Sequence, residues 1–163
     1  MREKRAIYGG TFDPVTNGHL DIIRRASKIF DEVTIAVADS SSKSPLFSLD
    51  VRVNMVEKSV AKISNVNVVS FNSLLVDLCS ELGVDVLVRG LRGAGDFEYE
   101  LNMGYANGSL KEGLETIYLI SSLETQFISS SLVRSLLPFN GKISHLVPKE
   151  ILEDIRRNYV YTT

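Results

Sequence analysis

The segment that decides the fold is residues 6–20, which read AIYGGTFDPVTNGHL. Residues 6–8 are apolar and predict a short strand that ends at the two glycines. Pro14 lacks the backbone N–H that a central strand needs, so the residues after the glycines are expected to form a loop. Beyond Gly18, apolar residues recur at helical spacing as far as Phe30. This order of strand, loop and helix indicates the start of an alternating α/β fold.

The rest of the chain continues the alternation of strands and helices. Further strands are predicted at residues 33–38, 66–71, 84–88 and 116–120, and helices beginning near Ser48, Ser73, Asp96, Ser130 and Pro148. Ser48 is a candidate N-cap, and Gly83 suits the left-handed position that ends a helix. Several strands are nearly continuous apolar runs, as in parallel sheets covered on both faces. The sequence therefore predicts one doubly wound, Rossmann-like α/β domain over residues 1–163, with a five-stranded parallel sheet.

Composition excludes several classes of protein. Eighteen Lys and Arg oppose 20 Asp and Glu, so the formal charge is −2, and the chain has no basic tail of the kind that nucleic-acid binders use. No apolar run approaches the roughly 18–20 residues that span a bilayer, and no secretory signal core follows the charged residues 1–5. We therefore expect a cytoplasmic protein that binds neither nucleic acid nor membrane.

The single cysteine and one of the two histidines are interpreted as structural. Cys79 cannot form an intramolecular disulfide, because the chain has no second cysteine. It lies four residues after Leu75 and three before Leu82, on the apolar side of a predicted helix, which favours a buried, unreactive thiol over a nucleophile. His145 is interpreted as a surface residue or a helix cap. No metal-binding residues are therefore assigned.

Polar residues follow the predicted strands at the edge where parallel α/β sheets bind their ligands. They are Thr11, Asp13 and His19 after the first strand, Lys43 after the second, Arg89 and Arg92 after the fourth, and a serine run at residues 129–131 after the fifth. Cations and a helix N-terminus at one edge favour a ligand with several phosphates. The alternative is that these are scattered surface residues close to loops.

The glycine-containing loop excludes two common nucleotide-binding motifs. It matches neither the dinucleotide fingerprint G-x-G-x-x-G nor the P-loop G-x-x-x-x-G-K-[ST]. Hydride transfer and P-loop hydrolysis are accordingly disfavoured.

Three segments carry a resemblance to a known family. The run TFDP followed by TNGH, residues 11–14 and 16–19, resembles the (H/T)-x-G-H signature of the nucleotidylyltransferase superfamily. The run RGLR at residues 89–92, followed by DFEYE at residues 96–100, resembles phosphopantetheine adenylyltransferases, and so does FISSSLVR at residues 127–134. The resemblance covers about residues 5–150. The family more often has proline where this chain has Gly9.

The resemblance implies roles for individual residues. His19, Lys43 and Arg89 are the implied catalytic residues, with His19 contacting the α-phosphate of ATP. Contacts to ATP are implied for Thr11, Phe12, His19, Gly90, Leu91, Arg92, Glu100, Thr125, Gln126, Phe127, Ile128, Ser129, Ser130 and Ser131. Contacts to the acceptor are implied for Thr11, Lys43, Leu75 and Arg89. From the pattern alone, Leu75 could equally be an ordinary core leucine and Glu100 a solvated helix carboxylate.

The family implies adenylyl transfer from ATP to 4′-phosphopantetheine, with Mg²⁺ accompanying the ATP and a homohexamer built as a dimer of trimers. Two alternatives stay open. Nicotinate mononucleotide adenylyltransferases also carry GGTFDP, although they usually have P-H-x-G-H where this chain has threonine at position 16. A catalytically silent nucleotide-binding protein could use the same scaffold, because a fold does not determine a function.

Overall fold

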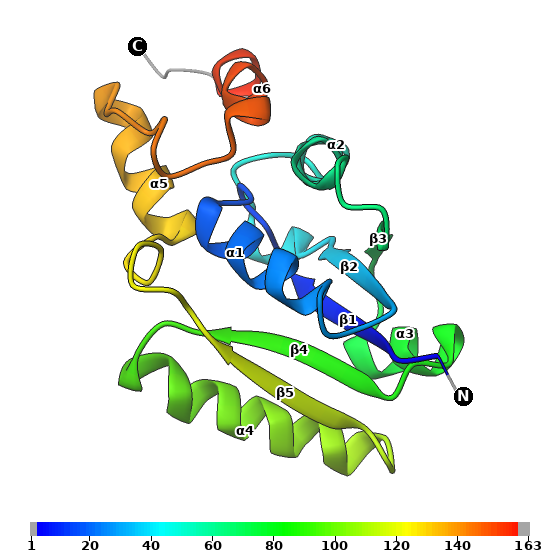
Figure 1. Ribbon diagram of the computed structural model, residues 1–163. Coiled ribbons are helices and arrows are strands. Elements are labelled where there is room, and N and C mark those ends of the chain that lie inside the picture. The colour runs from blue at the N-terminus through cyan, green and yellow to red at the C-terminus, as the bar shows by residue number, and fades with distance from the viewer. Residues whose placement is uncertain (1–2, 160–163) are drawn as a thin grey trace.

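The computed structural model describes residues 3–159, which form a parallel sheet with helices on both faces (Figure 1). The strands are β1 (Arg5–Gly10), β2 (Glu32–Ala38), β3 (Val66–Phe71), β4 (Val86–Leu91) and β5 (Glu115–Ile120). The α-helices are α1 (Asn17–Ala26), α2 (Leu49–Val60), α3 (Leu75–Leu82), α4 (Ala94–Leu110), α5 (Ser130–Leu136) and α6 (Leu152–Asn158), with short 3₁₀ turns at Ser41–Lys43, Leu137–Phe139 and Lys149–Ile151.

The order of the strands is β3-β2-β1-β4-β5, and every pairing is parallel. The chain builds outward from β1 in one direction, then returns to β1 and builds outward in the other. This reversal makes the fold doubly wound, so the predicted fold class and strand number are confirmed. Sheets of this kind bind ligands beyond the carboxyl ends of the strands, at the point where the strand order reverses. In this sheet that point lies between β1 and β4.

Both faces of the central strands are buried. Ile7 of β1 packs with Cys79 and the other apolar residues of α3 on one face. Tyr8, the next residue, belongs to the larger cluster that includes Ile23 of α1 and Met55 of α2 on the opposite face. This alternation follows from the two-residue period of a strand. An uninterrupted apolar strand must therefore be covered by other elements on both of its faces.

Cys79 is fully buried, as the apolar stripe predicted. Burial raises the pKa of its thiol to about 11, which keeps the thiol protonated and poorly nucleophilic at neutral pH. No helix within residues 3–159 is both long and apolar enough to span a bilayer.

Element ends differ from the sequence-based expectation in several places. Helix α1 ends at Ala26 rather than near Phe30, because residues 27–30 form a turn that still buries the Phe30 ring. Helix α3 begins at Leu75, not Ser73, and α4 begins at Ala94, not Asp96.

Strand β4 occupies residues 86–91 rather than 84–88, since Arg89 and Gly90 pair with β5. The charge at Arg89 masked the end of this strand. Ser48 occupies the N-cap position of α2, but its side chain makes no capping hydrogen bond. Gly83 ends α3 with a φ of 62°, as predicted.

Candidate active site

Two adjoining cavities open at the carboxyl ends of the strands. The first cavity has a volume of about 330 Å³ and is lined by β1, the start of α1, the end of β4, the start of α4 and residues 128–134. The second cavity, of about 300 Å³, is lined by the ends of β1 and β2, Lys43, Leu75 and α4. Both are lined by Gly9, Gly10, Thr11, Arg89 and Glu100. Ligands held in the two cavities would therefore meet at these shared residues.

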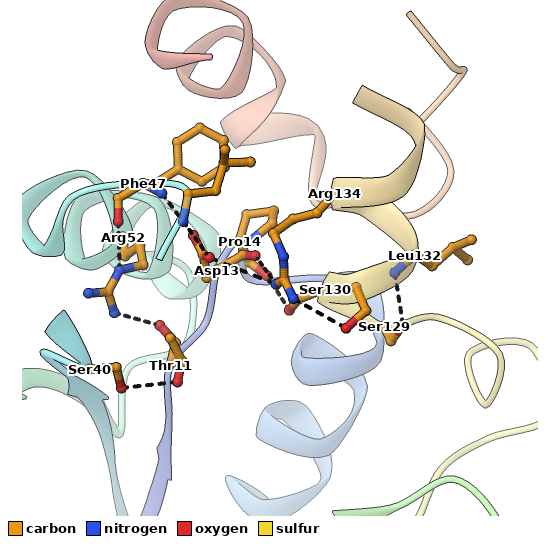
Figure 2. Close-up of polar contacts among 12 residues, drawn as sticks. Thr11, Asp13, Pro14, Ser40, Phe47, Arg52, Ser129, Ser130, Leu132 and Arg134 are labelled. Atoms are coloured by element: carbon orange, nitrogen blue, oxygen red, sulfur yellow. Dashed lines mark hydrogen bonds and ion pairs between the residues drawn. The ribbon is translucent and has the colours of Figure 1, made fainter. Parts of the chain in front are cut away.

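The loop after β1 is held by its own buried carboxylate. Asp13 is 4% exposed, and its two carboxylate oxygens accept hydrogen bonds from the backbone N–H groups of Leu46 (2.8 Å) and Phe47 (2.9 Å) (Figure 2). Arg134 of α5 donates to the Asp13 carbonyl oxygen at 2.7 Å. The loop is thus tied to segments more than 30 and 120 residues away, which keeps it in place beside the cavities.

A buried arginine donates hydrogen bonds to four backbone carbonyl groups in and beside the same loop. Arg52 of α2 is 1% exposed and donates to the carbonyl oxygens of Phe47, Thr11, Ala38 and Asp39 at 2.6–3.0 Å. The planar guanidinium suits this task because its five N–H donors point in fixed directions. The Arg52 guanidinium therefore holds the end of β2 and the loop of Thr11 together. Nothing in the sequence around Arg52 distinguishes it from a surface arginine.

His19 occupies the third position of α1 and takes part in its N-terminal cap. The Thr16 N–H donates to His19 Nδ1 at 3.0 Å, while the His19 N–H donates to the Thr16 hydroxyl at 3.3 Å. Because Nδ1 accepts this bond, the proton of the neutral imidazole resides on Nε2.

Burial, with the charges of Arg92 and Arg89 as the next causes, lowers the pKa of His19 to about 4. The ring also makes an edge-on contact with Phe12, their centroids 4.9 Å apart. His19 is therefore a neutral, oriented N–H donor on the wall of the first cavity.

Arg89 and Glu100 form an ion pair at the boundary of the two cavities. Arg89 Nε and one terminal nitrogen donate to the two carboxylate oxygens of Glu100 at 2.8 and 2.7 Å, and the other terminal nitrogen donates to the Gly9 carbonyl oxygen at 2.6 Å. The side chain of Glu100 is 10% exposed and that of Arg89 27%. The interpretation of Glu100 as a solvated carboxylate is therefore wrong, because the tertiary fold brings Arg89 onto it.

The serine run adds hydroxyl groups to the first cavity. Ser129 caps α5 by accepting a hydrogen bond from the Leu132 N–H at 3.1 Å, and Ser130 donates to the Pro14 carbonyl oxygen at 2.8 Å (Figure 2). Ser131 accepts from Arg134 at 3.2 Å. Capping and cavity lining are thus carried out by neighbouring serines of one segment.

Comparisons with known proteins agree with this geometry. Residues 7–136 match the family model described as Cytidylyltransferase-like. A phosphopantetheine adenylyltransferase of Nautilia profundicola is 56% identical over 151 residues, which cover 93% of this chain and 98% of that protein. The enzymes of that name from Wolinella succinogenes and Helicobacter pylori strain J99 are each 56% identical, over 94% and 91% of this chain and 96% and 95% of their own lengths.

The chain belongs to the phosphopantetheine adenylyltransferase family. The resemblance carried by the three sequence motifs is thereby confirmed.

Most of the residues for which the family resemblance implies a contact or a catalytic role lie on the cavity walls. The first cavity is lined by Thr11, Phe12, His19, Arg89, Gly90, Arg92, Glu100, Ile128, Ser129, Ser130 and Ser131. The second is lined by Thr11, Lys43, Leu75, Arg89 and Glu100. Leu75 is only partly buried and lies against Gly9, so it is not a simple core leucine.

Neither cavity is lined by four other residues for which the family resemblance implies a contact: Leu91, Thr125, Gln126 and Phe127. The Thr125 hydroxyl lies 2.9 Å from that of Ser122 and donates to Asp21 of α1, which ties this loop to the helix. Phe127 is 57% exposed. His145 is exposed, as predicted, and its carbonyl oxygen accepts a hydrogen bond from the Asn17 side chain.

Several lining residues were missed by sequence reasoning. Tyr99, Met103 and Asn107 of α4 all line the second cavity. Their spacing of four residues places them on one helix face, which is the signal that could have found them. Arg134 lies within the motif of residues 127–134, yet its contact with Asp13 could not be predicted from the spacing of the two residues.

Carboxylates near the cavities are paired with arginines rather than grouped. Asp96 pairs with Arg92 at 3.0 Å, and Asp13 lies 3.8 Å from Arg134. Within residues 3–159 no three His, Cys, Asp or Glu side chains are grouped so as to hold a metal ion.

Proposed function

We propose that this protein transfers the adenylyl group of ATP to 4′-phosphopantetheine, giving dephospho-coenzyme A and pyrophosphate, a step of coenzyme A biosynthesis. The observation that carries the proposal is the junction of two cavities at Arg89, Glu100 and Thr11. A transfer between two substrates needs such a junction, because the reacting atoms must be held about 3–3.5 Å apart.

The first cavity suits ATP. Its wall combines serine hydroxyls with the guanidinium groups of Arg89, Arg92 and Arg134, each of which has a carboxylate beside it. These N–H and O–H groups suit the acceptor oxygens of a triphosphate. Gly90 allows this part of the wall to pack closely on α1, because a Cβ there would lie 3.0 Å from the Ile22 side chain.

The second cavity suits a phosphate that carries a long amide chain. Lys43 and Arg89 supply positive charge beside Thr11. Leu75 and Met103 offer apolar surface, and Asn107 offers an amide. This combination matches 4′-phosphopantetheine, whose phosphate is followed by methyl groups, methylenes and two amides.

The reaction forms a bond from an oxygen of the acceptor phosphate to the α-phosphorus and breaks the bond from that phosphorus to the bridging oxygen of pyrophosphate. The attacking phosphate is already ionised near neutral pH, so no strong general base is required. The protein must align the two phosphates and neutralise charge, which is the main source of catalysis in such transfers. His19 Nε2–H, Lys43 and Arg89 are the groups to which we assign this work.

Magnesium is proposed to enter with ATP as its counter-ion, where it neutralises charge on the phosphates. The residues present fit this arrangement, since Mg²⁺ commonly relies on phosphates and water rather than a protein cage. The carboxylates near the cavities already have arginine partners. The consumption of ATP leads us to propose that the protein works in the cytoplasm.

We expect phosphopantetheine to support ATP-dependent release of pyrophosphate and nicotinate mononucleotide to support none. The reason is the apolar surface that Leu75 and Met103 add to the second cavity, against which charged and hydroxyl groups of a mononucleotide would be left unpaired. A coupled pyrophosphate assay with both acceptors, and with ATP alone, measures this. Turnover with the mononucleotide only would overturn the assignment. Calorimetric binding of ATP without turnover on any acceptor would identify a silent nucleotide-binding protein.

We propose a homohexamer and expect light scattering after size-exclusion chromatography to give about six times the 18.1 kDa of the chain. Support comes from large apolar side chains that are exposed in the single chain, among them Tyr105 (70%) and Leu110 (63%) of α4 and Ile120 (72%) of β5. Exposed apolar surface of this kind commonly marks an interface. A monomer at micromolar concentration would refute the expectation.

A further inference from the structure

Helix α4 approaches strand β5 closely at Gly104. A Cβ placed on Gly104 would overlap the hydroxyl oxygen of Tyr118, so a larger residue must displace either the helix or the ring. Gly108, one turn later on the same helix, has only the Leu114 carbonyl oxygen nearby, at 3.9 Å. The close approach is therefore local to Gly104 and is not a general property of α4.

The space at Gly104 is filled by a hydrogen-bonded hydroxyl. Tyr118 donates to the carbonyl oxygen of Glu100 at 2.8 Å. In an α-helix that carbonyl points along the axis toward the N–H of residue 104, which explains why the hydroxyl lies against Gly104. A side chain of β5 thus reaches the backbone of α4 only because the helix has no Cβ at this position.

The residue that Tyr118 holds is the partner of Arg89. Glu100 binds the Arg89 guanidinium through both carboxylate oxygens, and Arg89 also donates to the Gly9 carbonyl oxygen. Arg89 is in turn the register partner of Tyr118 across β4 and β5. A closed chain of contacts therefore runs from Tyr118 through Glu100 to Arg89, at the boundary of the two cavities.

We propose that Tyr118 is a positioning residue for acceptor binding: through the gap left by Gly104 it anchors Glu100 and thereby holds Arg89 in place. The same anchor sets the distance of α4 from the sheet, and α4 carries Tyr99, Met103 and Asn107 on the wall of the second cavity. The inference rests on the proposed function, since Arg89 and this cavity are assigned there to phosphopantetheine.

A double-mutant cycle tests the inference. Gly104→Ala is expected to raise KM for phosphopantetheine about tenfold or more, with a smaller change in kcat, because α4 must move outward with one wall of the second cavity. Tyr118→Phe removes one hydrogen bond and is expected to raise the same KM about fivefold. The double variant should return to the level of Tyr118→Phe. Without the hydroxyl, the nearest ring carbon lies 3.6 Å from the new Cβ, an ordinary contact.

Gly108→Ala is the matched control, because it adds the same methyl group to the same helix in open space. Its KM for phosphopantetheine should equal that of the wild type. A Gly104→Ala variant with a wild-type KM, or a double variant no better than Gly104→Ala, would overturn the inference while leaving the proposed function intact. A wild type that does not turn over phosphopantetheine would overturn both. Thermal unfolding of all five proteins, wild type included, reports separately on folding.

Discussion

Replacement of His19 by alanine is expected to lower kcat about 10²–10³-fold, or roughly 3–4 kcal/mol, the usual effect of removing one preorganised donor from an active site. The Nε2–H bond should be stronger in the transition state, where negative charge gathers on the α-phosphate, than in bound ATP. A bond of that kind raises kcat, whereas a bond of constant strength would lower the Michaelis constant instead. Steady-state kinetics together with calorimetric ATP binding separates the two effects.

The neutral state of His19 gives this prediction a pH dependence. Since burial and the charges of Arg92 and Arg89 lower the pKa of His19 to about 4, the imidazole stays uncharged above that pH. The pH profile of kcat/KM, which reports groups of the free enzyme, should therefore show no inflection from His19 near pH 6.5. His19→Gln, which keeps an N–H donor of similar reach, should recover part of the activity. A folded His19→Ala protein with near-normal kcat would remove His19 from the mechanism.

The second large effect is expected for Arg89→Met. This change leaves the Glu100 carboxylate, 10% exposed, without its cation. Breaking a buried ion pair by removing one partner typically costs about 3–5 kcal/mol, so the free energy of unfolding should fall by about that amount. Activity should be lost as well, because Arg89 lines both cavities. Denaturant unfolding and steady-state kinetics measure the two losses independently.

The double variant Arg89→Met/Glu100→Gln separates stability from catalysis. A neutral amide at position 100 no longer needs a cation, so most of the lost stability should return. Activity should not return, because the positive charge beside the reacting phosphates is still missing. A double variant with recovered turnover would show that Arg89 acts only as the structural partner of Glu100.

The sequence was most informative where its signals were local. Nearly continuous apolar runs predicted the strands, and apolar residues at helical spacing predicted the helices. Gly83 marked the end of α3, because glycine readily adopts the positive φ found there. The predicted end of a strand was less accurate where a charged residue interrupted its apolar run. Arg89 lies within β4 because its backbone pairs with Tyr118, and backbone pairing is indifferent to the charge of the side chain. A strand that ends in a functional residue will therefore look too short in a sequence.

The candidate site shows the same difference between what local sequence signals predict and what tertiary contacts decide. The location at one edge of the sheet followed from topology, because parallel strands direct all their carboxyl ends to the same side. The individual partnerships did not follow from spacing. Glu100 could be a solvated carboxylate until Arg89 was found 2.7 Å away, and Arg52 had no feature that distinguished it from a surface arginine.

The sequence by itself determined the α/β class, the doubly wound domain, the edge of the sheet at which the two cavities open and, through three motifs, the family. Only the tertiary structure decided that Arg52 is buried beneath the loop of Thr11, that Glu100 holds Arg89, and that Gly104 makes room for Tyr118. The reason is physical. Periodicity and turn chemistry depend on residues a few positions apart, whereas these contacts join residues 11 to 41 positions apart and exist only after the sheet has brought their elements together.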